Sequence, residues 1–222
     1  MTNFIHNIDK NNFFYSSITT LVYAQFGINE MFSRGFMTKA WVTHKNDFEG
    51  FQKYIFSFGF NSSINNEIFK ARNFTPLIFV PGFLKKDKTI AYEFDPYQSA
   101  VEFVNDTGGR TSANIELTHM TILKAFEKIA DLNLSGDVFE FFRHVRNASA
   151  HNGKFHFHKK VLNKEGELLK IAKWENFEIK ASMNGLYLIM EHKEDTTSFF
   201  DQGDLVEFLL DFENHYPEIK KN

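Results

Sequence analysis

The stretch Glu140–Gly153, EFFRHVRNASAHNG, decides the fold that we expect for this chain. At about 100° per residue, its apolar side chains gather on one side of a helical wheel, which predicts a helix that faces the core. These apolar residues are Phe141, Phe142, Val145 and Ala148. The opposite side carries Arg143, His144, Arg146, Asn147 and His151, with Phe139 near its edge. The pair Asn152-Gly153 is typical of a left-handed helix stop, so we expect an amphipathic helix over residues 135–152.

Capping residues indicate where this helix begins. Ser135 or Asp137 can cap its first turn, and Glu140 follows Asp137 by three residues, as in a capping box. The cationic face of the helix therefore lies toward its carboxyl end.

Other stretches also have helical periodicity. Residues 112–131 place Ile115, Ile122, Phe126 and Ile129 on one stripe, and a final helix from Asp204 does so with Leu205, Phe208, Leu209 and Phe212. The N-terminal third repeats the pattern twice, with Ile18, Leu21, Val22 and Phe26, and with Phe48, Phe51, Tyr54, Ile55 and Phe58. These stripes predict a mainly α-helical fold.

A small antiparallel β-hairpin insertion is expected at about residues 154–191, because the hydrophobic period there changes to two. KFHFH (154–158) alternates Phe and His, and FEIKA (177–181) and LYLIM (186–190) flank Asn184-Gly185, a typical hairpin tip. Residues 75–110 are interrupted by prolines and by Gly108-Gly109, which predicts a long connection with a short helix around Gln98–Val104.

Length and composition indicate one globular domain. The chain has 222 residues, 43% of them hydrophobic, and no cysteine, which excludes disulfides and thiolate metal sites. We therefore expect a single domain, 1–222, in which residues 1–110 form N-terminal helices and the long connection. The absence of a signal-peptide pattern and of a long apolar segment predicts a cytoplasmic protein without a membrane association.

Charge is distributed unevenly. The net charge of −3 disfavours a broad, sequence-independent grip on nucleic acid. Residues 141–160, however, hold five Lys and Arg residues and no Asp or Glu, whereas the remainder holds 20 basic and 28 acidic residues. This local basic surface on an acidic body favours a focused anion site.

The string Arg146-Asn147-Ala-Ser-Ala-His151 resembles the signature of the HEPN superfamily. In that signature an Arg, usually followed by Asn, Asp or His, precedes a His by four to six residues on a core helix. The longer string FRHVRNASAHNG, the preceding helix, the insertion with Trp174 and the closing helix are similar to HEPN proteins of bacterial mobile elements and defence systems. The resemblance covers residues 111–217 and does not extend to residues 1–110.

This resemblance implies a HEPN-like helical bundle and a metal-independent endoribonuclease that uses no cofactor. Its composite site would form where two 135–152 helices meet in a homodimer. The protein would act on RNA as a toxin or antiphage effector, with an antitoxin or a defence partner, and would leave 2′,3′-cyclic phosphate ends.

The residue types suit this chemistry. Histidine can transfer a proton near neutral pH, and a guanidinium can hold a phosphate through several donors. We therefore expect His151 and Arg146 to be catalytic, with Asn147 orienting one of them by a hydrogen bond. Arg143, His144 and Lys154 are the expected RNA-binding residues.

Two questions stay open at the level of sequence. Arg146 projects about 140° from His151 on the wheel, so either Arg146 bends toward His151 or a second copy of the helix completes the site. A catalytically inactive HEPN-like module that binds RNA, a nucleotide or a protein is the alternative function. An interaction protein with an aromatic surface is a third possibility.

Three other stretches are weaker candidates. His156 and His158, with His144 or His192, have zinc-ligand character, the alternative being exposed strand residues. Asp106–Ser112, DTGGRTS, is either a phosphate cradle or a flexible entry loop with an N-cap. Ser149 lacks the G-x-S-x-G context of a nucleophile.

Overall fold

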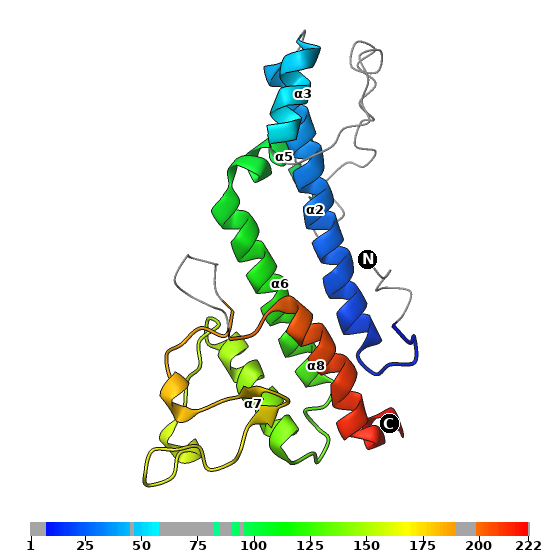
Figure 1. Ribbon diagram of the computed structural model, residues 1–222. Helices are drawn as coiled ribbons and strands as arrows, with labels where there is room; N and C mark the ends of the chain where they lie inside the picture. Colours follow the sequence, from blue (N-terminus) through cyan, green and yellow to red (C-terminus); the bar gives the residue numbers. More distant parts are fainter. Residues whose placement is uncertain are drawn as a thin grey trace. The chain divides into compact units, whose positions relative to one another are not determined.

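The computed structural model describes residues 8–44, 47–57, 82–84, 90–93, 96–189 and 199–221. It is mainly helical, as the sequence predicts, and its described residues also form two small two-stranded antiparallel sheets (Figure 1). The contacts divide the chain into two compact units, Met1–Gln25 with Thr111–Asn222, and Phe26–Arg110. Residues 1–25 thus cluster with the C-terminal half, and we describe each unit by itself.

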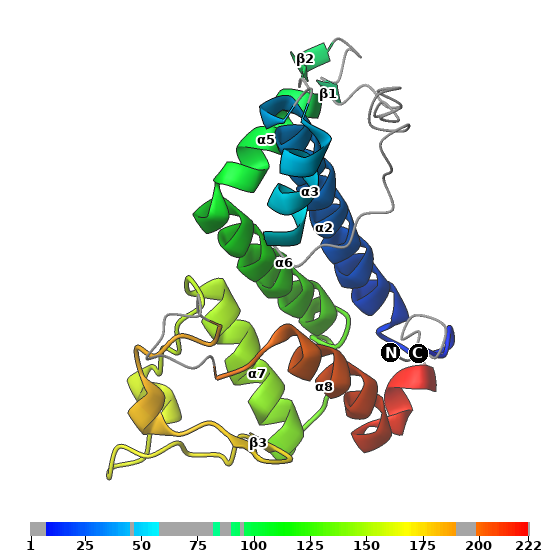
Figure 2. The ribbon, with the colours of Figure 1, turned by 45° about the horizontal axis from the view of Figure 1, so that its top comes forward.

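The first unit is built around helix α7 (Asp137–Ala150). It also contains the start of α2 (Tyr15–Thr43), most of α6 (Thr107–Glu127) and α8 (Gln202–His215). Short 3₁₀ turns η1 (Lys159–Val161), η2 (Ala181–Met183) and η3 (Pro217–Lys221) complete it, together with β3 (Lys173–Trp174) and β4 (Phe177–Glu178). In Figure 2, α7 and α8 lie side by side next to the β3 segment.

Helix α7 supplies the centre of this core. Phe141, Phe142, Val145 and Ala148 are all fully buried, which confirms the predicted apolar face. The Phe142 ring packs edge-on against Phe208 and Phe212 of α8. It also meets Phe126 of α6 and Phe14, which precedes α2. The burial of these rings fixes the position of α7 among three other segments. The same packing therefore determines the direction in which the polar side of α7 points.

The predicted cap of α7 is wrong. The N-cap is Gly136, which has no side chain to cap the helix, and neither Ser135 nor Asp137 makes the predicted cap. Instead the hydroxyl of Tyr216 accepts from the Phe139 backbone N–H at 3.0 Å and donates to the Ser135 carbonyl at 3.0 Å. Tyr216, at the end of α8, therefore caps a helix that begins about 80 residues earlier in the chain.

The predicted stop of α7 is confirmed. Asn152 and Gly153 have φ values of 54° and 72°, in the left-handed region. The Gly153 backbone lies so close to His119 of α6 that a Cβ at this position would be 2.5 Å from the His119 ring. Both the backbone conformation and the neighbouring imidazole therefore require glycine here.

The predicted hairpin around Asn184-Gly185 is wrong. The antiparallel strands are β3 and β4, with Trp174 opposite Phe177. Their rings stack with centroids 5.4 Å apart, and Trp174 is buried, so this aromatic pair decides the register. Residues 181–183 form η2 instead of a strand, and Met190 lies outside the described residues.

KFHFH forms no regular strand, yet its alternation is real. Phe155 and Phe157 are buried, whereas His156 and His158 are exposed. Lys154 forms an isolated bridge with Tyr187, and the Leu188 backbone N–H donates to the Gly153 carbonyl at 2.7 Å. The segment therefore continues directly from the end of α7 as an extended cover over the core.

The final helix, α8, agrees with its predicted stripe. Leu205, Phe208, Leu209 and Phe212 are all fully buried. Its first turn is closed by the Asp204 carboxylate, which accepts from the Asp201 backbone N–H at 2.8 Å. On α8 the buried Glu213 accepts from the Phe13 backbone N–H at 2.6 Å and pairs with Lys220, which ties the N-terminal segment to this helix.

The second unit has a small core of its own. It contains the remainder of α2, α3 (Phe48–Ser57), β1 (Gly82–Leu84), β2 (Ile90–Glu93) and α5 (Pro96–Asn105). Among its described residues, the buried hydrophobic side chains are Phe36, Ala40, Phe51 and Ile55. The α5 helix confirms the expected short helix, whereas the antiparallel β1–β2 pair was not foreseen.

The two predicted apolar stripes of the N-terminal third are only partly observed. Ile18 and Leu21 are buried, but Phe26 is exposed, so the first stripe holds only in part. Phe58 lies outside the described residues. Within the described parts of the chain, no helix combines the length and apolar character needed to span a bilayer.

Candidate functional site

The polar face of α7 is where the sequence places the site. Arg143, Arg146 and Asn147 are half-buried there, and His151, just past the last turn, is exposed. His144 differs from the expectation, because its side chain is only 4% exposed. Its ring packs edge-on against Phe157 with centroids 5.3 Å apart, so the segment after α7 covers this side of the helix.

Arg146 keeps an unneutralised charge. Its Nη1 donates to the Asn147 side-chain oxygen at 3.3 Å, and its guanidinium lies 5.8 Å from the centroid of the Phe126 ring. No carboxylate pairs with it among the residues that the structure describes. A guanidinium fixed by an amide and a ring, with no acid beside it, is well suited to receive an anion.

His151 occupies the C-cap of α7. Its backbone N–H donates to the carbonyls of Asn147 and Ala148, at 3.1 and 3.0 Å. Its ring lies beside that of His156, with centroids 5.6 Å apart. In the described chain no hydrogen bond or ring contact joins His151 to Arg146, so the option in which Arg146 bends back within one chain is not the one observed.

Arg143 is engaged in a different way. Its Nε and Nη2 approach Oε2 of Glu140 at 2.7 and 2.5 Å, and Lys170 Nζ approaches Oε1 at 2.7 Å. Burial of Glu140, which is 3% exposed, would raise its pKa, but hydrogen bonds from Lys170 and Arg143 outweigh it and hold the pKa below the usual value. Two cations therefore surround one buried carboxylate.

This ion-pair cluster lines a cavity of about 350 Å³. The lining residues are Phe139, Glu140, Arg143, His144, Lys160, Val161, Leu169 and Lys170. Burial and, to a smaller degree, the charge of Arg143 lower the pKa of His144 to about 4, against the opposing effect of Glu140. The imidazole is therefore neutral at pH 7. The sequence places Lys160 in its basic stretch but does not show that Lys160 lies beside this helix, and it gives no signal for Lys170.

Lys154, the third expected RNA-binding residue, lies over a ring. Its Nζ is 4.4 Å from the centroid of Tyr187, a contact that holds the ammonium near the end of α7. Lys154 follows Gly153 directly, so it extends the basic surface beyond the helix.

The zinc alternative gains no support from the described residues. No three His, Asp or Glu side chains within the described ranges gather closely enough to hold a metal ion. His158 instead accepts from the Lys160 backbone N–H through Nδ1, and His144 is buried away from it against Phe157. His192 lies outside the described residues.

His119 is a further residue whose position near the site the sequence did not reveal. It is 6% exposed, and its Nε2 has no hydrogen-bond partner in the described chain. Burial lowers its pKa, with Glu116 acting in the opposite direction. Because its ring lies against Gly153, it supports the turn that carries His151 away from the helix.

The other two sequence candidates have structural roles. Asp106 accepts from the Gly109 N–H at 2.8 Å, and α6 begins at Thr107, so the stretch is a capped helix start and not a flexible loop. The hydroxyl of buried Ser149 donates to the Val145 carbonyl at 3.0 Å, which leaves it no access to a substrate.

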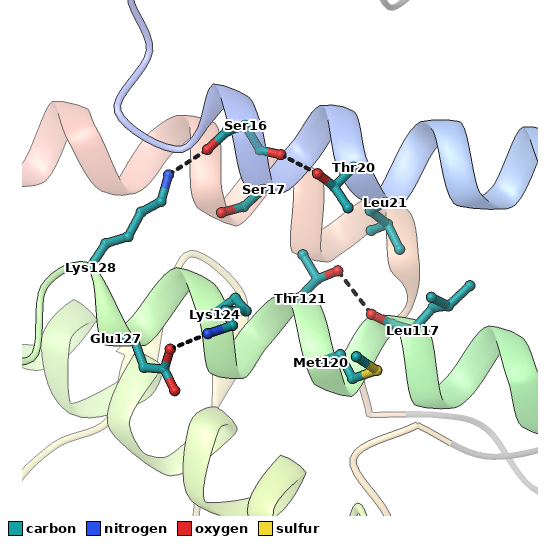
Figure 3. A pocket seen from close by; sticks show the side chains of 10 residues that line it. All are labelled: Ser16, Ser17, Thr20, Leu21, Leu117, Met120, Thr121, Lys124, Glu127 and Lys128. Carbon is teal, nitrogen blue, oxygen red and sulfur yellow. Dashed lines mark hydrogen bonds and ion pairs between the residues drawn. The ribbon is translucent and has the colours of Figure 1, made fainter. Parts of the chain in front are cut away.

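A second hollow, of about 560 Å³, lies between α2 and α6 in the first unit (Figure 3). Its polar groups bind one another: Lys128 Nζ donates to Ser16 Oγ at 2.7 Å, and Lys124 pairs with Glu127 at 2.8 Å. The hydroxyl of Thr121 donates to the Leu117 carbonyl. The polar groups of this hollow are therefore engaged with one another or with backbone carbonyls, and the hollow carries no pair of residues that resembles the motif on α7.

Comparison with models of protein families, with curated proteins and with solved structures finds no match.

Proposed function

We propose that this protein is a HEPN-type, metal-independent endoribonuclease that acts as a toxin or antiphage effector. The observation that carries the proposal is the presence of an Arg146 without an acidic partner and an exposed His151 on the carboxyl-terminal part of one core helix. Arg143 shows the contrast, because the same helix neutralises that arginine with Glu140. A purely structural arginine would be expected to have such a partner.

The chemistry that these residues support is attack by the RNA's own 2′-hydroxyl. The O2′–P bond forms and the P–O5′ bond breaks, which leaves a 2′,3′-cyclic phosphate and a 5′-hydroxyl. One group must accept the 2′ proton and another must donate a proton to O5′. His151 takes one of these roles, and Arg146 stabilises the charge that develops on the phosphorane oxygens.

The second proton-transfer group has two sources. His156, whose ring lies beside His151, supplies one within the chain. A second copy of the chain supplies another His151 and brings an Arg146 opposite it. The lack of contact between Arg146 and His151 within one chain favours the homodimer, with Asn147 holding Arg146 in place.

The first test is RNA cleavage by the pure protein in EDTA. We expect fragments that end in 2′,3′-cyclic phosphate, and a loss of rate of about 10² to 10⁴ in His151→Ala, the usual size of a general acid-base contribution. Arg146→Ala should lose activity to a similar degree. His215→Ala is the control, because His215 is an exposed histidine at the end of α8 and lies outside the motif.

Each result has a clear reading. Cleavage that needs a divalent cation, or that survives both substitutions, contradicts the proposal. RNA bound without cleavage by the wild-type protein would point instead to the inactive, RNA-binding module. In cells, growth arrest on overexpression that either substitution relieves supports a toxin.

A further inference from the structure

The cavity beside α7 combines features that point to a ligand. His144 lines it, is almost fully buried, and neither of its ring nitrogens has a hydrogen-bond partner in the described chain. Because its ring nitrogens are not sealed inside the core, they are accessible from the cavity that His144 lines. Because this imidazole is neutral at pH 7, it offers one donor and one acceptor to whatever occupies the cavity.

Positive charge surrounds the same cavity. Arg143, Lys160 and Lys170 line it, against a single carboxylate, that of Glu140. Glu140 forms ion pairs with Arg143 and Lys170, whereas Lys160 has no acidic partner among the described residues. The guanidinium of Arg143 has five N–H donors, of which Glu140 uses those on Nε and Nη2, so donors remain for an anion.

The remaining wall is apolar. It consists of Phe139, Val161 and Leu169. At about 350 Å³ the cavity is at the lower end of the range for small-molecule sites, which suits one planar ring system and excludes a stack of several. An apolar wall, a donor-acceptor imidazole and a cationic rim together match a nucleobase that carries a phosphate.

We propose that this cavity binds a single nucleotide, with the base against His144 and Phe139 and the phosphate at Lys160 and Lys170. As a pocket for one nucleotide of the substrate strand, it rests on the proposed ribonuclease function. Arg143 and His144 lie about one helical turn before Arg146 and Asn147 on α7, so a strand held here continues toward the motif. A free nucleotide is the other source of the same chemistry.

Binding separates this proposal from catalysis. A fluorescein-labelled ten-nucleotide RNA of mixed sequence is titrated against the full-length His151→Ala variant, which should not cut it. Two substitutions are then added: Lys160→Glu, which reverses charge at the rim, and Leu169→Trp, which fills the cavity. Leu169 is 60% exposed, so the larger side chain does not disturb the core.

Matched controls exist for both. Lys159→Glu makes the same charge change in the same 3₁₀ turn, and Ile171→Trp adds the same ring at a site 62% exposed, yet neither residue lines the cavity. We expect Kd to rise about tenfold in the two cavity variants, about 1.4 kcal/mol, and to change less than about twofold in the controls. Equal effects of Lys159→Glu and Lys160→Glu, or no effect of Leu169→Trp, would overturn the proposal.

Competition identifies the ligand. AMP, CMP, GMP, UMP and inorganic phosphate are each added to the same complex. Displacement by at least one nucleotide at a concentration about tenfold below that of phosphate supports a nucleotide site, whereas equal displacement by phosphate contradicts it. If nucleotides bind, Leu169→Trp weakens their binding and RNA does not bind, the site is assigned to a free nucleotide. Such binding without any RNA cleavage by the wild type would refute the ribonuclease and leave the nucleotide site standing.

Discussion

Arg143 and Arg146 are one turn apart on α7 and have opposite electrostatic surroundings. Arg143 is held by the buried carboxylate of Glu140, whereas Arg146 has only an amide and a ring beside it. The sequence alone places both arginines on one polar face, because a helical wheel gives the direction of a side chain and not the residues that it contacts. The distinction between a positioned cation and an available one comes from three-dimensional contacts, and it makes Arg146 the stronger candidate for phosphate.

The burial of His144 has the same kind of cause. A helical wheel divides α7 into a core face and an open face, and His144 falls on the open one. The chain after Gly153 then folds back, and Phe157 covers that side. Arg146, Asn147 and His151 could be selected from the motif. Lys160, Lys170 and His119 could not, because nothing in the sequence shows that these three side chains come close to α7 or to Gly153.

Gly153 offers a prediction at the residue scale. Gly153→Ala places a methyl group 2.5 Å from the His119 ring and forces alanine into a left-handed conformation. The conformation alone costs about 1 to 2 kcal/mol, so the free energy of unfolding should fall by clearly more than this. Urea denaturation measures the loss.

The control separates strain from collision. Gly185 also has a left-handed φ, of 87°, but open space around it, so Gly185→Ala should lose only the conformational part. Adding His119→Ala to Gly153→Ala should restore part of the stability through a coupling between the two sites. Strict additivity of the two substitutions would show that the imidazole is not what excludes a side chain.

Hydrophobic periodicity predicted the helices correctly, whereas the capping and turn motifs did not predict how α7 begins or where the hairpin forms. The stripes of α7 and α8 are buried as expected, because one apolar face is enough to position a helix against a core. The capping box of α7 failed because Glu140 turns to Arg143 and Lys170 instead of to its own first turn. The Asn184-Gly185 hairpin failed because the Trp174–Phe177 pair forms a tighter one earlier in the chain.

The cap that Tyr216 provides can be tested directly. Tyr216→Phe keeps the ring contact with Phe212 but leaves the Phe139 N–H and the Ser135 carbonyl without this partner. We expect the free energy of unfolding to fall by about 1 kcal/mol or somewhat more, as for other lost helix caps and hydrogen bonds. Tyr23→Phe is the control, because Tyr23 is largely exposed. Equal stabilities of the two variants would contradict the role of Tyr216.

Helix α7 should also make stability depend on pH. The pKa of His144 is about 4 in the folded chain, well below the ordinary 6.5, because burial and Arg143 disfavour the charged ring against the pull of Glu140. As the pH falls from 6.5 toward 4, the unfolded chain takes up this proton first, so stability is lost, by up to about 3 kcal/mol. His119, with a lowered pKa, acts in the same direction.

The substitution His144→Phe removes the part of the pH dependence of stability that comes from this imidazole. Urea midpoints measured between pH 7 and 4.5 should fall less steeply for the variant than for the wild type, with His119 accounting for a residual slope. The range ends at 4.5 because the depressed pKa of Glu140 adds a separate loss below that value. Parallel curves for the two proteins would mean that His144 becomes protonated without cost.

At the scale of the molecule, what matters is which part of α7 stays open. One side of the helix faces α8 and α6, and Phe157 covers another. Within the described residues, α7 is open at the cavity beside Arg143 and at the carboxyl end with Arg146, Asn147 and His151. The end of one helix offers only a few side chains. A catalytic site at this position therefore needs further side chains from another segment or another chain. A second copy, related by a two-fold axis, supplies them in an arrangement that closes on itself.

Mixing two inactive variants tests whether the site is shared between copies. If each site takes Arg146 from one copy and His151 from the other, a dimer of Arg146→Ala with His151→Ala contains one intact site and one doubly defective site. Random exchange at equal amounts makes about half of the dimers mixed, so about a quarter of the wild-type activity should return. RNA cleavage after co-refolding measures this recovery, with each variant refolded alone as the baseline. A mixture no more active than its parts would place the whole site within one chain and turn attention to His156, whose ring already lies beside His151.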